Sequence, residues 1–292
     1  MADITDVFDG NRQGRDWVGP RRPVGDPDWR PFAGPLNLAS QRYALQVIRT
    51  CARWLREQNY LLVNPWASMR AVAGPPEPLA LERVPTQHHW VLIRDLADAL
   101  EGHGWEVGAA QRCRFVLDFL RGTGLRVSEL AALRLADLYE GEPGEWSARV
   151  QGKGGKVAVI DLLPLAKRAL ETYLRDRGLS SLIEANDPHL PVVSMLARVD
   201  VGLSRKALWA ILARFRALGI TELTPVNPRL GEQLRRLSPH ALRHVFGSHA
   251  LANGASLKDV QEALRHSNIR TTSLYVHADQ RQRRRRLAAT FG

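Results

Sequence analysis

The chain has 292 residues, 45% of them hydrophobic and 24% charged, an ordinary globular composition with enough length for two domains. Its formal net charge of +11 favours a polyanionic partner, with nucleic acid ahead of a membrane surface. No apolar run approaches the ~20 residues of a membrane-spanning helix, and the first residues lack the basic and apolar regions of a signal peptide. Cys51 and Cys113 are too few for a disulfide framework, so we expect a cytoplasmic protein.

The N-terminal part begins with an irregular segment, residues 1–35, in which repeated prolines stand among arginines and prevent a helix. The first predicted helix runs from about Ser40 to Glu57, because apolar residues recur there at intervals of three and four. Its apolar positions are Tyr43, Ala44, Val47, Ile48, Cys51, Trp54 and Leu55. A proline-rich linker follows at 73–78, so residues 36–76 are predicted to form a small helical domain.

Basic residues lie largely outside that apolar face, at Arg42, Arg49 and Arg53. Such a face is common on the solvated surface of soluble proteins, and it also suits contact with a nucleic-acid backbone. The pattern does not decide between these two interpretations.

Residues 82–292 are predicted to form a larger, mainly α-helical domain with one small antiparallel β-sheet, an α+β arrangement. Two strands, at 146–151 and 156–162, flank a glycine-rich turn and indicate a hairpin. Ser128 and Ser238 are predicted helix N-caps, and Ser256–Asp259 has the pattern of a capping box. Further helices are predicted at 86–100, 109–121, 165–177 and 204–217, with a turn at 122–124.

The chemistry gathers in an ordered set of polar residues: Arg126, Lys153, His240, Arg243, His266 and Tyr275. A phosphodiester anion repels nucleophiles, so its cleavage needs neutralised charge, a positioned nucleophile and a proton for the leaving oxygen. Arginine forks match phosphate oxygens, and His240 and Arg243 lie one helical turn apart on the same side. The remaining tyrosines fall in apolar patterns and are expected to pack: Tyr43, Tyr60, Tyr139 and Tyr173.

Two other patterns have weaker support. His240 and His244 have the spacing of a zinc pair, but no glutamate follows His240 as the helical metalloprotease motif requires. The glycines around Lys153 lack the order of a nucleotide-binding loop. We therefore expect neither a metal ion nor a cofactor.

These residues and their neighbours resemble the tyrosine recombinase (phage integrase) family, in particular its Xer-like site-specific recombinases. The matching segments are Thr123–Leu130 (TGLRVSEL), Gly152–Gly154 (GKG), His240–His244 (HALRH), Leu264–His266 (LRH) and Thr271–Tyr275 (TTSLY). The resemblance covers about residues 83–278 and implies that 82–292 is the family's catalytic domain. Residues 36–76 would then be a reduced or truncated form of its core-binding domain, which clamps DNA.

The resemblance also implies the roles of the polar set. Tyr275 would attack the scissile phosphate, Lys153 would protonate the 5′-oxygen that leaves, and the two histidines would lie beside the phosphate. Lys156, three residues after Lys153, is an alternative acid and a predicted DNA contact together with the three arginines of the first helix. Glu129 resembles the acidic residue that orients the active-site groups, although a first-turn helix role explains it almost as well.

The implied function is cleavage and rejoining of double-stranded DNA through a 3′-phosphotyrosine link, in integration or recombination of a mobile element. Four protomers would act together on paired sites. Two alternatives stay open: a type IB topoisomerase-like activity, which uses similar residues in a monomer, and a catalytically impaired DNA-binding remnant of an integrase. The short N-terminal domain predicts that this chain binds DNA but recombines poorly.

Overall fold

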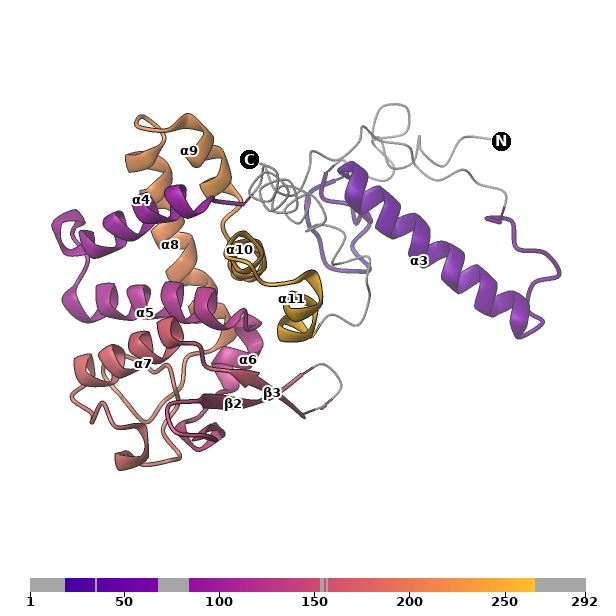
Figure 1. The fold of residues 1–292 in the computed structure, drawn as a ribbon. Coiled ribbons are helices and arrows are strands. Elements are labelled where there is room, and N and C mark those ends of the chain that lie inside the picture. Colours follow the sequence, from indigo (N-terminus) through magenta and orange to yellow (C-terminus); the bar gives the residue numbers. More distant parts are fainter. Residues whose placement is uncertain (1–18, 35, 68–83, 153–154, 156, 266–292) are drawn as a thin grey trace, which may run out of the picture. The chain divides into compact units, whose positions relative to one another are not determined.

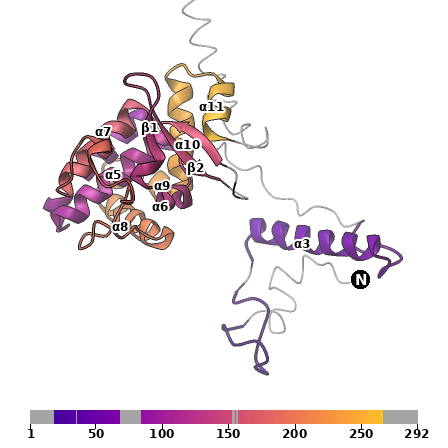
Figure 2. The ribbon, with the colours of Figure 1, turned by 90° about the horizontal axis from the view of Figure 1, so that it is seen from below.

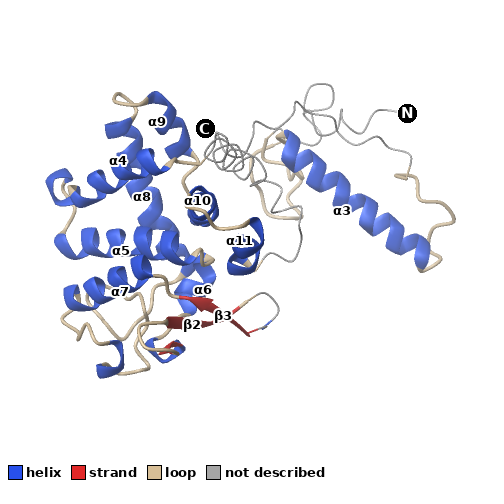
Figure 3. Cartoon of the chain, in the orientation of Figure 1, coloured by secondary structure: helices blue, strands red, loops and turns tan. Residues whose placement is uncertain are grey.

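The computed structural model describes residues 19–34, 36–67, 84–152, 155 and 157–265. The chain divides into two compact units, Met1–Glu77 and Pro78–Gly292. Helices are the main element, and the second unit also holds one small antiparallel sheet (Figure 3). This confirms the predicted fold class. Among the helices that the structure describes, none combines the length and the apolarity that crossing a bilayer requires.

In the first unit, helix α3 (Leu38–Glu57) begins earlier than predicted, because the Asn37 side chain accepts a hydrogen bond from the Ser40 amide. Much of its predicted apolar face is exposed. Tyr43 is 69% exposed and Tyr60 is 74% exposed, so neither lies in a core, although the Tyr60 ring stacks on Trp54 of α3 with 6.3 Å between centroids. The helical period shows which side of a helix is apolar, but it does not show what covers that side.

The second unit is built from eight helices within the part of the chain that the structure describes (Figure 1). They are α4 (Gln87–Asp98), α5 (Val107–Thr123), α6 (Val127–Ala132), α7 (Pro164–Asp176), α8 (Arg205–Leu223), α9 (Pro228–Arg235), α10 (Pro239–Ala252) and α11 (Leu257–Leu264). Short 3₁₀ turns stand at Leu100–His103, Leu135–Asp137 and Ile183–Ala185.

The sheet consists of β1 (Leu138–Glu140), β2 (Trp146–Gln151) and β3 (Val157–Asp161) in the order β1-β2-β3, all antiparallel. Ala148 of β2 pairs with Leu138 on one side and with Ile160 on the other, and all three side chains are buried. The predicted hairpin is therefore present. The short first strand was not predicted, because three residues are too few to show an alternating pattern.

Helix α5 forms the centre of the second unit, and Figure 1 shows it running between α4 and α7. It also packs against α8 and α10. Nearly all of its second half is buried, including Phe119 and Leu120 at 0% exposure. At Gly122 an added Cβ would lie 3.0 Å from Ala166 of α7, so a glycine permits the close approach of these two helices.

Two local predictions are wrong at the end of α5. The predicted turn at 122–124 is helical up to Thr123, whose hydroxyl donates to the Phe119 carbonyl, and only Gly124 leaves the helix with φ 61°. Ser128 is not an N-cap but lies inside α6, because Arg126 occupies the N-cap position and Glu129 caps its amide. In contrast, Ser238 caps α10 and Ser256 caps α11 as predicted.

Candidate active site

Arg126 stands directly after the chain reversal that ends α5. Gly124 adopts the left-handed conformation there, and Leu125 is fully buried, which anchors the turn in the core. Arg126 is then extended, with φ −73° and ψ 148°, and α6 follows it. Its side chain is 42% exposed, so the guanidinium is held at the base of the turn and remains open to a ligand.

Glu129 holds Arg126 from one helical turn further on. Its Oε2 accepts from the Arg126 amide at 2.8 Å and its Oε1 from Arg126 Nη1 at 2.9 Å. Oε2 also accepts from Arg265 Nη2 at 2.7 Å. Burial alone would raise the pKa of Glu129, but the hydrogen bonds from Arg126 and Arg265 outweigh it and lower the pKa. Glu129 therefore caps the start of α6 and also contacts the Arg126 guanidinium.

The Arg243 side chain contacts the same turn, although Arg243 lies 119 positions after Gly124 in the sequence. It lies in α10 and is buried, and its Nη1 donates to the Gly124 carbonyl at 2.6 Å. Phe246, one turn further along α10, and Leu264 of α11 pack so closely on Gly124 that a Cβ there would lie under 3 Å from both. Figures 1 and 2 both show α10 and α11 side by side. These contacts bring the two predicted phosphate-binding arginines to one turn.

His240 lies one turn before Arg243 at the start of α10, where the Ser238 cap and Pro239 begin the helix. Its ring meets the ring of His244 edge-on, with 4.5 Å between centroids. Partial burial, and then the positive charges of Arg243 and Arg126, lower the pKa of His240 below its usual 6.5. The lowered pKa favours the neutral imidazole of His240, in which one ring nitrogen donates and the other accepts.

Several predicted site residues lie outside the residues that the structure describes: Lys153, Lys156, His266 and Tyr275. Of the predicted hairpin turn between β2, which ends at Gln151, and β3, which begins at Val157, the structure describes Gly152 and Gly155. The described chain ends at Arg265, immediately before His266. The predicted DNA contacts Arg42, Arg49 and Arg53 all lie on α3 of the first unit, with Arg42 and Arg53 exposed.

The sequence did not predict that Arg265 would contact the residues around Arg126. Arg265 follows α11 and joins the Glu129 carboxylate to the segment that precedes His266. No sequence signal marks this contact, because the two residues are 136 positions apart and neither belongs to a local pattern with the other.

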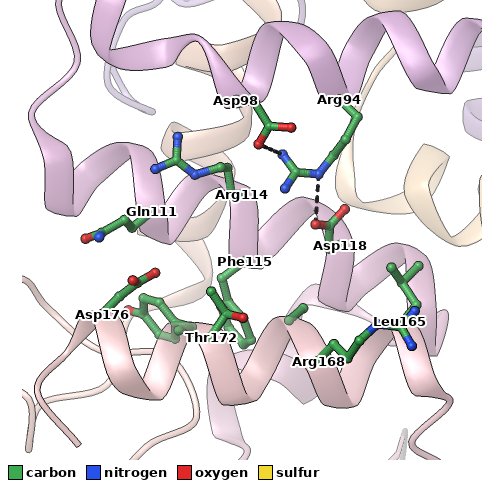
Figure 4. Close-up of a pocket in the computed structure, with 12 residues that line it drawn as sticks. Arg94, Asp98, Gln111, Arg114, Phe115, Asp118, Leu165, Arg168, Thr172 and Asp176 are labelled. Atoms are coloured by element: carbon green, nitrogen blue, oxygen red, sulfur yellow. Dashed lines mark hydrogen bonds and ion pairs between the residues drawn. The ribbon is translucent and has the colours of Figure 1, made fainter. Parts of the chain in front are cut away.

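A polar cavity of about 360 Å³ lies between α4, α5 and α7 and is not lined by Arg126 or Arg243 (Figure 4). Arg94 stands between two carboxylates in it, with Nη1 2.7 Å from Asp98 and Nε 2.9 Å from Asp118. Burial raises the pKa of Asp118, and the charge of Arg94 partly offsets this. Arg94 is therefore already paired with both acids, and its ion pair with Asp118 joins α4 to α5.

A mainly helical domain that brings two arginines to one turn, with the His240 imidazole close enough to feel both positive charges, is suited to bind a phosphate group. A family model described as the phage integrase family matches residues 93–282, more than half of the chain. The chain therefore belongs to the phage integrase family, as its motifs predicted.

Known relatives agree with this assignment. Tyrosine recombinase XerC of Roseiflexus sp. is 35% identical over 167 residues, which are 57% of this chain and 47% of that protein. Tyrosine recombinase XerC of Agrobacterium fabrum is 30% identical over 218 residues, covering 75% of this chain and 61% of that protein. The matched part thus spans less than two thirds of either relative.

The fold is similar to that of a solved recombinase. The crystal structure of XerH site-specific recombinase, bound to palindromic difH substrate in a post-cleavage complex, matches with a TM-score of 0.62. The sequence identity is 20%, and the match covers 88% of this chain and 68% of that one. At this identity the similarity establishes the fold.

Proposed function

We propose that this protein is a site-specific DNA recombinase that cuts and rejoins double-stranded DNA through a covalent tyrosine link. The observation that carries the proposal is that Arg243 contacts the turn that carries Arg126, with His240 one helical turn before Arg243 and under the influence of both positive charges. Arg243 lies 119 positions from the glycine it contacts, so this contact is a property of the fold. Three groups suited to a phosphate anion converge there, in a chain of the phage integrase family.

The proposed reaction is a transesterification. The Tyr275 oxygen attacks the scissile phosphorus, a new P–O bond forms, and the bond to the 5′-oxygen breaks. Lys153 gives a proton to that 5′-oxygen, with Lys156 as the alternative acid, and a 3′-phosphotyrosine and a 5′-hydroxyl result. The 5′-hydroxyl of a partner strand then reverses the step, so no bond energy is lost and no cofactor is consumed.

The described residues explain how the charge is balanced in this scheme. The pentacoordinate phosphorus carries more negative charge than the starting diester, so preorganised cations favour it over the ground state. Arg126 is open to solvent and fixed by Glu129, whereas Arg243 is buried and fixed by the Gly124 carbonyl. The neutral His240 adds a donor, and His266 is proposed to be the second imidazole beside the phosphate.

Partner and assembly are part of the same proposal. Exchange between two duplexes needs four cleavages, so a homotetramer on paired sites is proposed. Arg42, Arg49 and Arg53 on α3, within the proposed core-binding domain at 36–76, would contact the backbone. Integration or recombination of a mobile element is the proposed setting, and a transposon integrase, that of Tn1549, is among the structures of similar fold with a TM-score of 0.56.

The test starts from duplexes that the full chain selects from a randomised library. The selected site is synthesised with a nick beside each candidate phosphate, so that the released 5′-fragment diffuses away and the covalent protein–DNA adduct accumulates. The wild type is expected to give an adduct that survives denaturing electrophoresis. Tyr275→Phe keeps the ring and should bind equally without forming it.

Three other results would change the assignment. An adduct with Tyr275→Phe would show that another residue is the nucleophile. Binding without any wild-type adduct would indicate the DNA-binding remnant. Relaxation of supercoiled DNA by a monomer, with no exchange between two selected sites, would indicate the topoisomerase-like activity.

A further inference from the structure

Arg265 adopts a backbone conformation that its residue type disfavours. It caps the C-terminus of α11 with φ 52° and ψ 46°, in the left-handed region. Glycine is the usual residue at such a position, because in this conformation a Cβ crowds the following carbonyl oxygen. Within the described residues, Asn59 is the one other non-glycine with positive φ, and asparagine tolerates this region. An arginine at this cap therefore calls for a compensating contact.

The compensating contact is the ion pair with Glu129. Arg265 Nη2 lies 2.7 Å from Glu129 Oε2, and the two side chains are 17% and 2% exposed. A pair so shielded from solvent is less weakened by water and salt than a surface pair. The left-handed backbone of Arg265 turns the chain at the end of α11, and its side chain extends from there to Glu129.

The contact changes the charge balance at Arg126. Glu129 alone would neutralise Arg126, because one carboxylate faces one guanidinium. With Arg265 bound to the same carboxylate, the three groups carry a net charge of +1. The arrangement fixes the geometry of Arg126 and preserves a positive charge for an incoming anion.

We propose that Arg265 is a positioning residue, which acts through Glu129 to hold Arg126 in place and keep it electropositive toward the scissile phosphate. The inference rests on the proposed function, because it concerns the phosphate site of that reaction. It also ties the end of α11 to the turn that carries Arg126, because one carboxylate contacts both arginines.

The experiment compares the full-length wild type with Arg265→Gly and Arg265→Lys. Glycine relieves the backbone at φ 52° while removing the guanidinium, so the fold is expected to survive, with a melting temperature near that of the wild type. Lysine keeps the charge but loses the planar fork. Single-turnover cleavage of the selected nicked site and equilibrium binding to the same site are measured separately.

Arg265→Gly is expected to lower the cleavage rate by about tenfold to a hundredfold, the scale of a small misplacement of a catalytic group, while the Kd changes by less than about threefold. Arg265→Lys should recover part of the rate. In a Glu129→Gln background, Arg265→Gly should cost less than about twofold, because the link is already cut. Arg198→Ala is the matched control, since Arg198 Nη2 also lies 2.7 Å from a carboxylate, that of Asp200, but in an exposed pair.

Wild-type cleavage by Arg265→Gly would overturn the proposal. So would equal losses of binding, cleavage and thermal stability, which would mean that Arg265 only ties α11 to the domain. If the wild type itself forms no adduct, the proposed function fails. The contact between Arg265 and Glu129 is then tested separately, by following the titration of Glu129 through the NMR signal of its carboxyl carbon. Removing the Arg265 guanidinium should raise the pKa of Glu129, because a hydrogen bond and a positive charge that favour the carboxylate are lost, and an unchanged titration would refute this link between Arg265 and Glu129.

Discussion

Acidification is expected to loosen the domain through one buried histidine, His249 of α10. His249 is 6% exposed, and its Nε2 lies 3.0 Å from the Pro85 carbonyl. Its Nδ1 accepts from Arg121 Nε at 3.3 Å, which fixes the neutral tautomer with the proton on Nε2. Burial and the charge of Arg121, opposed by the bond to Pro85, lower the pKa of His249 from 6.5 to about 4.

The sign of the effect follows from which state binds the proton. Between pH 6.5 and pH 4 the unfolded chain holds a proton on His249 and the folded chain does not, so acid favours unfolding. The contribution of His249 to the free energy of unfolding is present above pH 6.5 and is lost as the pH falls toward 4. With these two pKa values, the free energy of unfolding should fall by about 2 kcal/mol between pH 7 and pH 5 through this residue alone. That is a substantial part of a typical total of 5–15 kcal/mol.

The assay is urea unfolding at a series of pH values between 7 and 5, followed by far-UV circular dichroism, for the wild type and His249→Gln. Glutamine keeps an amide donor for the Pro85 carbonyl but does not titrate, so carboxyl groups elsewhere contribute equally to both proteins. The variant should be less stable at pH 7 and should lose about 2 kcal/mol less than the wild type on acidification. Parallel curves for the two proteins would refute the reasoning.

The remaining predictions concern the proposed phosphate site and the residues that support it. Arg126→Ala and Arg243→Ala should each slow cleavage by about 10²–10³ in single-turnover assays, and a chelator should leave the wild-type rate unchanged. Lys153→Ala should be slow on ordinary DNA and recover on a 5′-bridging phosphorothiolate, whose thiolate leaves without a proton; equal impairment on both substrates would exclude it as the acid. Gly124→Ala should lower the unfolding free energy by about 2–4 kcal/mol, because strain at φ 61° adds to a clash under 3 Å. Gly104→Ala, with φ 74° and no atom within 4 Å of the added Cβ, should cost about 1 kcal/mol in the same melt.

Local chemistry explains which parts of this structure are predictable from sequence. Ser238 and Ser256 are correct N-caps because a cap depends on a few adjacent residues. Ser128 is not, because the buried Glu129 caps from inside the helix and shifts the start to Arg126. Helix α9 was not predicted at all, although it has its own Asn227 cap and a proline at its first position.

The candidate site likewise combines features that local sequence predicts with contacts that it does not predict. The spacing of His240 and Arg243 on one helix predicts a shared side, since the helical period alone determines it. The contact of Arg243 with Gly124 and that of Arg265 with Glu129 depend on how distant helices pack, which no local pattern encodes. The exposed apolar side of α3 is a further case, because periodicity identifies an apolar face without identifying its neighbour.

The sequence separation of these contacts has a consequence for synthesis of the protein. The turn that carries Arg126 is made well before α10 and α11, yet Arg243 and Arg265 reach it from 119 and 136 positions downstream. A nascent chain on the ribosome therefore holds Arg126 and Glu129 without the two arginines that complete the group. Because chains are made at roughly 5–20 residues per second, several seconds separate the two halves of the site. The order of translation thus delays assembly of the proposed strand-cutting centre until nearly the whole domain has been made.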